Sequence, residues 1–569
     1  MREPLIQFSD FSFRYASQKY PTLKHINLSI YPGEKILILG PSGSGKSTLA
    51  NCINGLIPFS IDGQLEGSIK IAGGETRSSS IFHLSQQVGT VLQDSDAQFI
   101  SPRVDEDIAF ALENEMMPYA TMEQEVTKVA GIVGMSDFLD RQPFDLSGGQ
   151  KQRVSLAGVL NDQVQILLFD EPLASLDPKT GVLAMALIHR MNQEEHKTVI
   201  IIEHRLEDVL SVDIDRVILL KQGEIIADVS PDELLGSGLL KENGIREPLY
   251  LTALKFAGID VSKQKHLSSL KQMDLKDKQA GIKAWLKNMP KRQKRNEHQE
   301  IVSLEDVSYS YDQREFALDK VSLSLQKGEK VCLIGKNGAG KSTLAKILTG
   351  IVRPLRGKYL LLGEDGGQFT IKQIGQKVGY VMQNPNQMLI KDKVKAEVAL
   401  GLEFNNIPSE ELEQRCEEVL TLCGLWPMRN WPLGSLSYGQ RKRVTIASIL
   451  ALKPSLIILD EPTAGQDYRS YTEIMTFLEK LNQQLDVTIL FITHDMHLAI
   501  EYTDRAIVLA DGKLLADAPV YEVLANNEVI EKANLKQTSL YHLAQKLKLD
   551  PQDFIERFIG AEREERGHV

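Results

Sequence analysis

Two glycine-rich segments of the chain have the residue types needed to hold the phosphates of a nucleotide. Lys46 and Lys341 end these segments and lie 295 positions apart (341 − 46). Glycines let the backbone curl so that successive N–H groups point at phosphate oxygens, and the following helix N-terminus adds partial positive charge. In this pattern the lysine reaches the β- and γ-phosphates, and the serine after it binds Mg²⁺. The predicted nucleotide-binding residues are Gly40, Ser42, Gly43, Gly45, Lys46, Ser47 and Thr48 in the first copy and Gly335, Asn337, Gly338, Gly340, Lys341, Ser342 and Thr343 in the second.

A pair of acidic residues also occurs twice, each time directly after an apolar run of strand length. Asp170 and Glu171 follow one run, and Asp460 and Glu461 follow the other, 290 positions later (461 − 171). We expect each aspartate to lie beside a phosphate loop in a parallel sheet and to hold the hydration shell of Mg²⁺. Each glutamate is then placed to polarise the water that attacks the γ-phosphate, which is general-base chemistry.

Histidine and glutamine complete the two sets. His204 and His494 follow strands late in each copy, again 290 positions apart (494 − 204), and this repetition favours a γ-phosphate sensor over a structural role. Gln93 and Gln383 lie in loops after short apolar runs. Their amides can touch Mg²⁺ and report the presence of nucleotide to a neighbouring protein.

The sequence also predicts the strands and helices that must position these residues. An apolar run, 36–39 or 331–334, leads into each glycine loop, and a helix-prone stretch follows it. This strand–loop–helix order is the context that a phosphate-binding loop requires. Two tandem α/β units with parallel sheets are therefore predicted.

Length and composition exclude several classes of protein. The chain has 569 residues, which predicts several domains, and its 42 % hydrophobic and 25 % charged content fits a globular protein. Apolar stretches are of strand length, and no signal peptide is recognised, so we expect an intracellular protein that, if it serves a membrane, does so from the side. The four cysteines form no metal-ligand pattern and are expected to be reduced, mostly buried thiols. A net charge of −11 argues against a dedicated nucleic-acid binder.

Two charged segments stand apart from the repeat. Residues 263–295 contain eleven Lys or Arg against two acidic residues. We interpret this stretch as a solvated linker with short helices, the alternative being a surface for acidic lipid headgroups or RNA. The charged end, 562–566, is expected to be an exposed tail.

The motifs resemble the nucleotide-binding domain of ABC transporters, and the resemblance covers nearly the whole chain apart from the linker and tail. The family signature Leu-Ser-Gly-Gly-Gln stands at 146–150 and returns at 436–440 with Tyr438 in place of the first glycine. The resemblance implies that the signature of each half completes the ATP site of the opposite half. Tyr438 is then expected to loosen the ATP site that the second signature completes. We therefore expect two sites that are both competent but unequal in activity. It adds these ATP-binding residues: Ser147, Gly149 and Gln150 for the site of Lys341, Ser437, Gly439 and Gln440 for the site of Lys46, Asp177 and Asp467 in the D-loops, and Tyr15 and Tyr311 stacking on adenine.

The resemblance also implies an architecture. Each domain should have a RecA-like core, an antiparallel β subdomain and a helical signature subdomain. The predicted domains are a first ATP-binding domain at 1–240, a basic linker at 241–300, a second ATP-binding domain at 301–535 and a charged helical C-terminal tail at 536–569. ATP and Mg²⁺ are the implied cofactors, with Ser47, Gln93 and Asp170, and Ser342, Gln383 and Asp460, around the metal.

Three details are similar to the ATPases of energy-coupling factor (ECF) importers, which take up vitamins, their precursors or transition metals. These are the Gln-Asn-Pro-Asn-Gln segment at 383–387, the Lys-Gln-Arg-Val-Ser-Leu-Ala-Gly-Val-Leu segment at 151–160 and the Ile-Glu-His-Arg-Leu segment at 202–206. The implied partners are a transmembrane coupling protein and a small membrane substrate-binding subunit, with this chain peripheral on the cytoplasmic side of the cell membrane. The two ATPase domains would pair within one chain.

Rival classes remain at this point. The ABC-F translation factors also carry two cassettes and a charged linker, but Pro290 interrupts the linker where those proteins usually have two long helices. Fused sugar-importer ATPases often have a degenerate catalytic set in one copy, whereas both sets are intact here. A DNA-repair cassette protein of the best known kind would have zinc-ligand cysteine clusters. No residue identifies the cargo.

Overall fold

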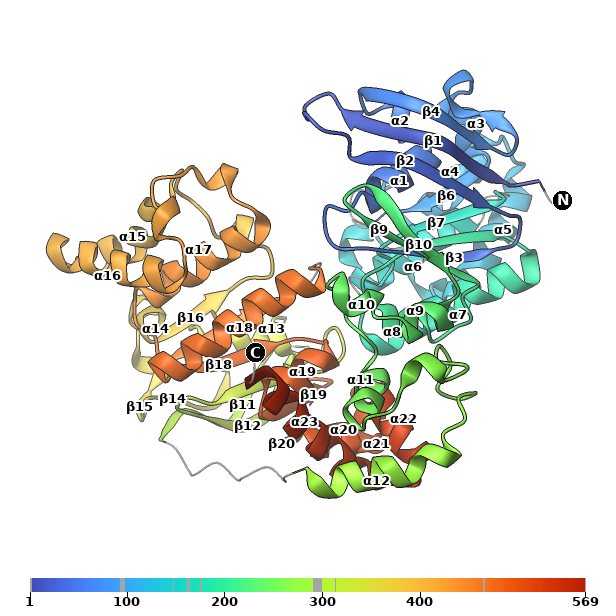
Figure 1. Ribbon diagram of the computed structural model, residues 1–569. Coiled ribbons are helices and arrows are strands. Elements are labelled where there is room, and N and C mark those ends of the chain that lie inside the picture. The colour runs from blue at the N-terminus through green and yellow to red at the C-terminus, as the bar shows by residue number, and fades with distance from the viewer. Residues whose placement is uncertain are drawn as a thin grey trace. The chain divides into compact units, whose positions relative to one another are not determined.

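The computed structural model describes residues 3–92, 98–146, 148–160, 164–173, 176–289, 299–312, 314–463 and 466–567. These residues form two compact units (Figure 1). Unit 1 comprises residues 1–282 and 466–469, and unit 2 comprises residues 283–465 and 470–569. Each unit contains one glycine loop and one acidic pair from the repeated motifs.

The core of unit 1 is a six-stranded sheet in the order β10-β9-β3-β8-β7-β6, parallel except for β10. All five residues of β3 are buried, because helices cover both faces of a parallel sheet and leave no solvated side. A second, antiparallel sheet has the order β2-β1-β4-β5. The strands are β1 (Ile6–Tyr15), β2 (Leu23–Ile30), β3 (Lys35–Leu39), β4 (Gly63–Ile71), β5 (Gly74–Glu75), β6 (Val88–Val91), β7 (Ile166–Asp170), β8 (Thr198–Ile202), β9 (Arg216–Lys221) and β10 (Glu224–Val229).

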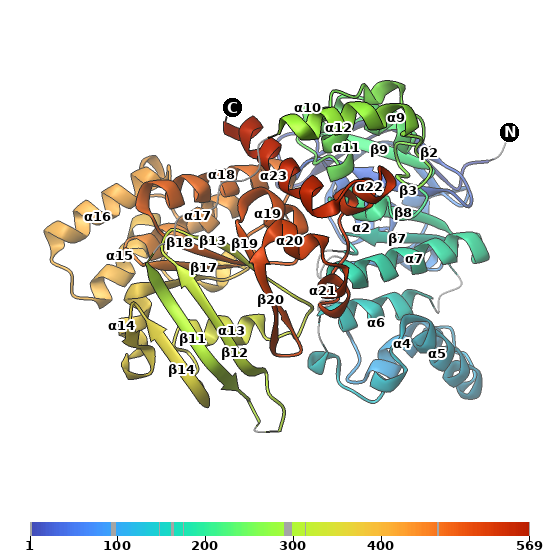
Figure 2. The same ribbon diagram turned by 90° about the horizontal axis from the view of Figure 1, so that it is seen from below.

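The helices of unit 1 fall into three groups. Helices α4, α5 and α6 pack on one another as a helical subdomain, seen together in Figure 2. Helices α1–α3 and α7–α8 accompany the sheets, α9–α11 follow the last strand, and α12 continues from unit 1 into unit 2 at residue 283. Their bounds are α1 (Lys46–Ile53), α2 (Leu56–Phe59), α3 (Ile81–Ser85), α4 (Val104–Asn114), α5 (Tyr119–Val133), α6 (Gly148–Leu160), α7 (Pro178–Glu195), α8 (Leu206–Val209), α9 (Pro231–Gly236), α10 (Leu239–Glu242), α11 (Leu249–Phe256) and α12 (Gln279–Asn288).

Unit 2 repeats this plan. Its six-stranded sheet has the order β16-β17-β18-β13-β19-β20, its antiparallel sheet the order β12-β11-β14-β15, and α15–α17 form the helical subdomain. The strands are β11 (Glu300–Tyr309), β12 (Leu318–Gln326), β13 (Lys330–Ile334), β14 (Arg356–Leu361), β15 (Glu364–Asp365), β16 (Val378–Val381), β17 (Leu456–Asp460), β18 (Thr488–Ile492), β19 (Arg505–Ala510) and β20 (Lys513–Pro519). The helices are α13 (Lys341–Leu348), α14 (Ile371–Lys377), α15 (Val394–Phe404), α16 (Ser409–Leu422), α17 (Tyr438–Leu450), α18 (Tyr468–Leu485), α19 (Met496–Tyr502), α20 (Val520–Ala525), α21 (Asn527–Lys532), α22 (Ser539–Lys546) and α23 (Pro551–Gly567).

The internal repeat extends further than the motifs suggest. Helices α9–α11 correspond to α20–α22. Gly244 and Asn534, 290 positions apart, both have left-handed backbones just after α10 and α21, and Gly258 and Lys548 do the same after α11 and α22. The buried Leu251 therefore belongs to a packed helix within the segment that sequence analysis assigns to the linker.

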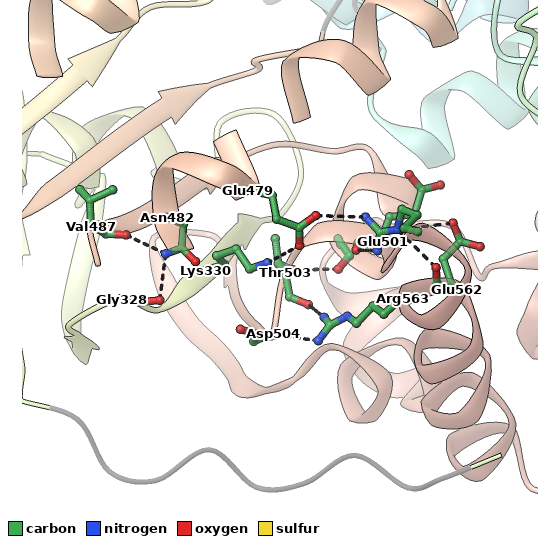
Figure 3. Close-up of polar contacts among 12 residues, drawn as sticks. Gly328, Lys330, Glu479, Asn482, Val487, Glu501, Thr503, Asp504, Glu562 and Arg563 are labelled. Carbon is green, nitrogen blue, oxygen red and sulfur yellow. Dashed lines mark hydrogen bonds and ion pairs between the residues drawn. The ribbon is translucent and has the colours of Figure 1, made fainter. Parts of the chain in front are cut away.

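The expectation of an exposed tail at 562–566 holds only for Glu564 and Glu565, because Glu562, Arg563 and Arg566 are half-buried. Helix α23 buries Phe554 and Phe558 and packs against α19, α20 and α22. Near its end, Arg563 donates to the Asp504 carboxylate (3.0 Å) and the Thr503 carbonyl (2.8 Å), as Figure 3 shows. The charged residues at 562–566 suggested exposure, but an arginine side chain can bury its aliphatic part while its guanidinium group binds polar groups.

The two units differ in the hydrogen-bond partner of a buried lysine that both contain. In unit 2, Lys330 Nζ donates to Glu479 Oε1 at 2.8 Å (Figure 3). In unit 1 the equivalent Lys35, 1 % exposed, has His189 Nδ1 at 2.5 Å instead. Burial lowers the pKa of Lys35, although Asp215 opposes this. Burial and the charge of Lys35 together lower the pKa of His189.

The substitution His189→Glu should stabilise unit 1 by at most about 1 kcal/mol, because it gives Lys35 a carboxylate partner like the one Lys330 has in unit 2. The pKa of His189 is lower in the folded chain than in the unfolded chain, so the unfolded chain takes up a proton first as the pH falls. The free energy of unfolding of the wild type is therefore largest above the ordinary histidine pKa near 6.5 and decreases below it. The variant should lose less stability between about pH 7 and 5. Calorimetric unfolding against pH measures both effects. The matched change Glu479→His should destabilise unit 2, and a variant no more stable than wild type would contradict the pairing argument.

Candidate functional site

Three parallel strands bring the motif residues of unit 1 to one edge of the sheet. Strand β3 leads into the glycine loop, β7 ends at Asp170, and β8 ends just before Glu203 and His204. Asp170 is in register with Ile202, and the Glu171 N–H donates to the Ile202 carbonyl at 2.9 Å. Because the carboxyl ends of parallel strands meet at the same edge, residues more than 150 positions apart become neighbours. In unit 2 the Glu461 N–H donates to the Ile492 carbonyl at the same distance.

Each glycine loop is closed by its own lysine. Lys46 Nζ donates to the carbonyls of Gly40 (2.8 Å) and Pro41 (3.1 Å), and Lys341 Nζ donates to those of Gly335 (2.6 Å) and Lys336 (2.9 Å). These ammonium groups sit where a bound phosphate would compete for them. Burial lowers the pKa of Lys46, and the nearby Glu171 raises it.

The loops need glycine immediately before the helix. Gly45 has φ 103° and caps α1, and Gly340 has φ 101° and caps α13. Side chains rarely adopt this left-handed backbone, and a Cβ on Gly340 would lie 2.5 Å from the Ala317 carbonyl oxygen. Each helix therefore begins with N–H groups that its own residues leave available for an anion. Ser42, Gly43, Ser47, Thr48, Asn337, Gly338, Ser342 and Thr343 lie in these loops or in the first turn of α1 and α13.

The two strand-end aspartates have different neighbours. In unit 1, burial raises the pKa of Asp170, while a hydrogen bond from Ser47 lowers it. In unit 2 the Tyr380 hydroxyl donates to Asp460 Oδ2 at 2.6 Å. Sequence analysis missed Tyr380, because only sheet pairing places β16 beside β17.

The residues of unit 1 fit a divalent cation. Asp170 Oδ1 is buried and has no hydrogen-bond partner among the described residues, and the Ser47 hydroxyl lies against the same carboxylate. Carboxylate and hydroxyl oxygens are the ligands Mg²⁺ prefers, together with substrate phosphates. Among the described residues, no group of three or more His, Cys, Asp or Glu side chains is arranged to hold a metal ion by itself.

Both glutamate–histidine pairs are formed. His204 Nε2 lies 3.2 Å from Glu171 Oε1, and His494 Nδ1 lies 2.7 Å from Glu461 Oε1. Both glutamates have positive φ, 52° and 43°, a conformation unusual for this residue. All four side chains are less than one-fifth exposed. A carboxylate held beside an imidazole at the mouth of a phosphate loop can accept a proton from a water molecule.

A second buried carboxylate distinguishes unit 1, and sequence analysis did not identify it. Glu203 Oε1 accepts a hydrogen bond from the Leu173 N–H (2.8 Å), and Oε2 accepts from the N–H groups of His204 (2.9 Å) and Arg205 (3.2 Å). Burial raises the pKa of Glu203, while Arg205 lowers it. Thr493 stands at the equivalent place in unit 2 and donates to Glu461 Oε2 at 3.4 Å.

The aromatic residues predicted to stack on adenine lie beside the glycine-loop helices. The Tyr15 hydroxyl is 2.9 Å from Thr48 Oγ1, and the Tyr311 hydroxyl is 3.3 Å from Thr343 Oγ1. The ring of Tyr311 is 58 % exposed and has Lys346 Nζ 5.3 Å from its centroid. A base could therefore reach this ring.

The signature and loop residues are placed as follows. Ser437 caps α17, and its side chain accepts from the Gln440 N–H at 3.2 Å. The Tyr438 hydroxyl donates to the Gln383 carbonyl at 3.1 Å. Asp177 caps α7 and accepts from the Thr180 N–H at 3.0 Å. Gly149 and Gln150 lie in α6, Gly439 lies in α17, Asp467 directly precedes α18, and Gln93 and Ser147 lie outside the described residues.

The prediction for the cysteines is confirmed. Cys52, Cys332, Cys416 and Cys423 are all buried and unbridged. Burial raises the pKa of the Cys416 thiol to about 11 and that of the Cys423 thiol to about 12.

Fold and site together define a tandem P-loop nucleoside triphosphatase. The chain matches the family described as "ABC transporter" over residues 23–174 and 318–464. It also matches the family described as "ATP-binding cassette cobalt transporter" over residues 237–309.

Similar proteins extend over the whole chain. It is 54 % identical over 563 residues to a "Putative ABC transporter ATP-binding protein" of Clostridium perfringens (strain 13 / Type A), covering 99 % of both chains. A protein of the same name from Enterococcus faecalis (strain ATCC 700802 / V583) is 53 % identical over 568 residues and is covered completely, as is this chain. One from Vibrio vulnificus (strain CMCP6) is 51 % identical over 562 residues, covering 99 % of this chain and 98 % of that protein.

The chain belongs to the ABC transporter family of ATP-binding proteins. This confirms the predicted fold class of two tandem ABC-type domains, the resemblance to ECF-type ATPases and the prediction of an ABC transporter ATPase. The family does not favour the ABC-F translation factors.

Proposed function

We propose that this chain is the ATP-binding subunit of an ECF-type importer and couples ATP hydrolysis to uptake of a small solute. The observation that carries the proposal is that each unit has its own phosphate loop, strand-end aspartate and glutamate–histidine pair. The presence of a complete set of these residues in both units supports an active ATPase. The cargo class, a vitamin, a vitamin precursor or a metal ion such as cobalt, draws support from the match over residues 237–309.

The residues of one unit divide the work. Lys46 would exchange its contacts with the loop carbonyls for the β- and γ-phosphates, and Ser47 and Asp170 would hold Mg²⁺, which supplies charge neutralisation at the phosphates when bound. Glu171 would orient the attacking water and accept its proton, with His204 beside the γ-phosphate. Residues Lys341, Ser342, Asp460, Glu461 and His494 would do the same in unit 2. By resemblance, the signature of each unit would complete the site of the other.

The helical subdomains would meet membrane partners. Unit 1 exposes Ile100, Met116 and Phe144 on or beside this subdomain, and unit 2 exposes Ile390 and Phe404. We assign these exposed apolar side chains to contacts with partner proteins. Among the described residues, none of the helices has the length and apolar character to cross a bilayer. By resemblance to ECF-type ATPases, the proposed partners are a transmembrane coupling protein and a small substrate-binding subunit, and the proposed location is the inner face of the cell membrane.

Fractionation of tagged chain from its own cells at low salt tests this proposal. We expect the protein to sediment with membranes and to purify with small hydrophobic proteins, one of which would identify the cargo. As a control, an unrelated soluble protein with the same tag is expressed in excess, and its recovery with the membranes measures nonspecific trapping. Recovery on ribosomes instead would overturn the importer proposal in favour of a translation ATPase.

A further inference from the structure

Helix α17 carries a lysine whose charge is buried behind the catalytic residues of unit 2. Lys442 is 1 % exposed. Its Nζ donates to two main-chain carbonyls, that of Gln383 at 3.0 Å and that of Glu461 at 3.5 Å. Gln383 follows β16 and Glu461 follows β17, so one ammonium group joins the helical subdomain to the ends of two core strands.

Two further side chains of α17 reach the same loop. The Tyr438 hydroxyl donates to the Gln383 carbonyl at 3.1 Å, so this carbonyl accepts from two residues one helical turn apart. Arg441 Nη1 donates to Asn386 Oδ1 at 2.7 Å. The start of α17 is thereby fastened to residues 383–386, the loop that begins with the predicted nucleotide-reporting glutamine.

A cation in this position is energetically costly. Burial lowers the pKa of Lys442 to about 8, although Glu461 and Asp460 oppose this. A buried ammonium is retained only where its hydrogen bonds repay the lost hydration. Its hydrogen bond to the Gln383 carbonyl is charge-assisted and stronger than a neutral one, and the longer contact with the Glu461 carbonyl adds electrostatic attraction.

Unit 1 has a different arrangement at this place. Gln152 replaces the lysine, and Gly148 replaces the tyrosine. Gln152 Nε2 donates to the Pro172 carbonyl, while its Oε1 is buried and has no hydrogen-bond partner among the described residues. The cationic link from the signature helix to the catalytic strand is thus a property of unit 2.

We infer that Lys442 is a positioning residue for ATP hydrolysis in unit 2, holding the Glu461 peptide and the Gln383 loop in fixed relation to α17. The inference rests on the proposed ATPase function. It assigns to Lys442 no contact with nucleotide. When α17 shifts, the lysine carries the displacement to the main chain of the catalytic glutamate, and a displacement of about 1 Å there is enough to slow the reaction.

Steady-state kinetics of Lys442→Gln, which installs the residue of unit 1, tests the inference. Measured in a chain whose unit 1 carries Glu171→Gln, so that unit 2 alone turns over, kcat should fall about tenfold while the KM for ATP and equilibrium ATP binding change less than about twofold, because the lysine sets geometry and not affinity. Lys480→Gln, an exposed lysine on α18, is the matched control and should behave as the Glu171→Gln parent. A kcat within about twofold of that parent, or a loss confined to ATP binding, would overturn the inference.

A milder variant covers the case in which Lys442→Gln does not fold, which thermal unfolding will reveal. Tyr438→Phe removes one of the two donors to the Gln383 carbonyl and leaves the buried charge in place. It should lower kcat about two- to threefold with KM unchanged; an unchanged kcat there would refute the coupling. The proposed function fails separately, and the inference with it, if the wild-type chain hydrolyses ATP no faster than a chain carrying Glu171→Gln and Glu461→Gln.

Discussion

A chain with both Glu171→Gln and Glu461→Gln should hydrolyse ATP about 10²–10⁴-fold more slowly than wild type and still bind ATP. Each glutamate is held at positive φ beside a histidine, 3.2 Å away in unit 1 and 2.7 Å in unit 2. Glutamine keeps the size and the hydrogen-bonding oxygen but cannot accept a proton from water. The glycine loops and their lysines are untouched, so nucleotide affinity should be preserved.

Phosphate release and equilibrium binding of ATP measure the two halves of this prediction. Glu195→Gln, an exposed glutamate at the end of α7, is the control for a change of charge alone. Hydrolysis at the wild-type rate in the double variant would remove both glutamates from the catalytic step. Loss of ATP binding together with hydrolysis would instead show that they hold the nucleotide.

Separate substitution of the two loop lysines should reveal unequal sites. Lys46→Ala and Lys341→Ala each remove the ammonium that now bridges two loop carbonyls, and each should weaken ATP binding in its own unit by about 10²-fold. We expect Lys341→Ala to cost more turnover, by about threefold. The reason is that Tyr438 stands where the other signature has Gly148 and would keep that backbone from close approach to the γ-phosphate of the Lys46 site, so the Lys341 site carries more of the activity.

Turnover and nucleotide binding of the two single variants, measured side by side, decide this prediction. Introducing Tyr438→Gly should narrow the difference between them by restoring the glycine of the first copy. Equal losses in the two lysine variants would refute the inequality, and a larger loss in Lys46→Ala would reverse its direction.

The contacts around the catalytic residues give the units separate characters. Asp170 retains a buried oxygen with no partner among the described residues, whereas Tyr380 donates to Asp460. Unit 1 buries Glu203 beside its histidine, and unit 2 buries Lys442 behind its glutamate. Two sites with the same motifs therefore have different ionisable groups, a carboxyl and an amine, packed behind their catalytic residues.

The sequence alone determined the family, the duplication and the residues at the phosphate loops and strand ends. These features are local: a glycine loop such as 40–46 needs only a strand before it and a helix after it. An acidic pair after a short apolar run needs only a parallel sheet. Residues that bind phosphate or accept a proton lie within short segments of the chain, so their type and spacing were sufficient to predict these sites.

Only the tertiary structure decided which groups support the catalytic residues. Tyr380 meets Asp460 across 80 positions because β16 pairs with β17, and Lys442 meets Glu461 because α17 packs over their ends. The packing of Arg563 on Thr503, which partly corrected the expected exposed tail, spans 60 positions. Such contacts depend on the register of strands and the docking of helices, which no short segment encodes, because the free energy that fixes them is shared over the whole buried core.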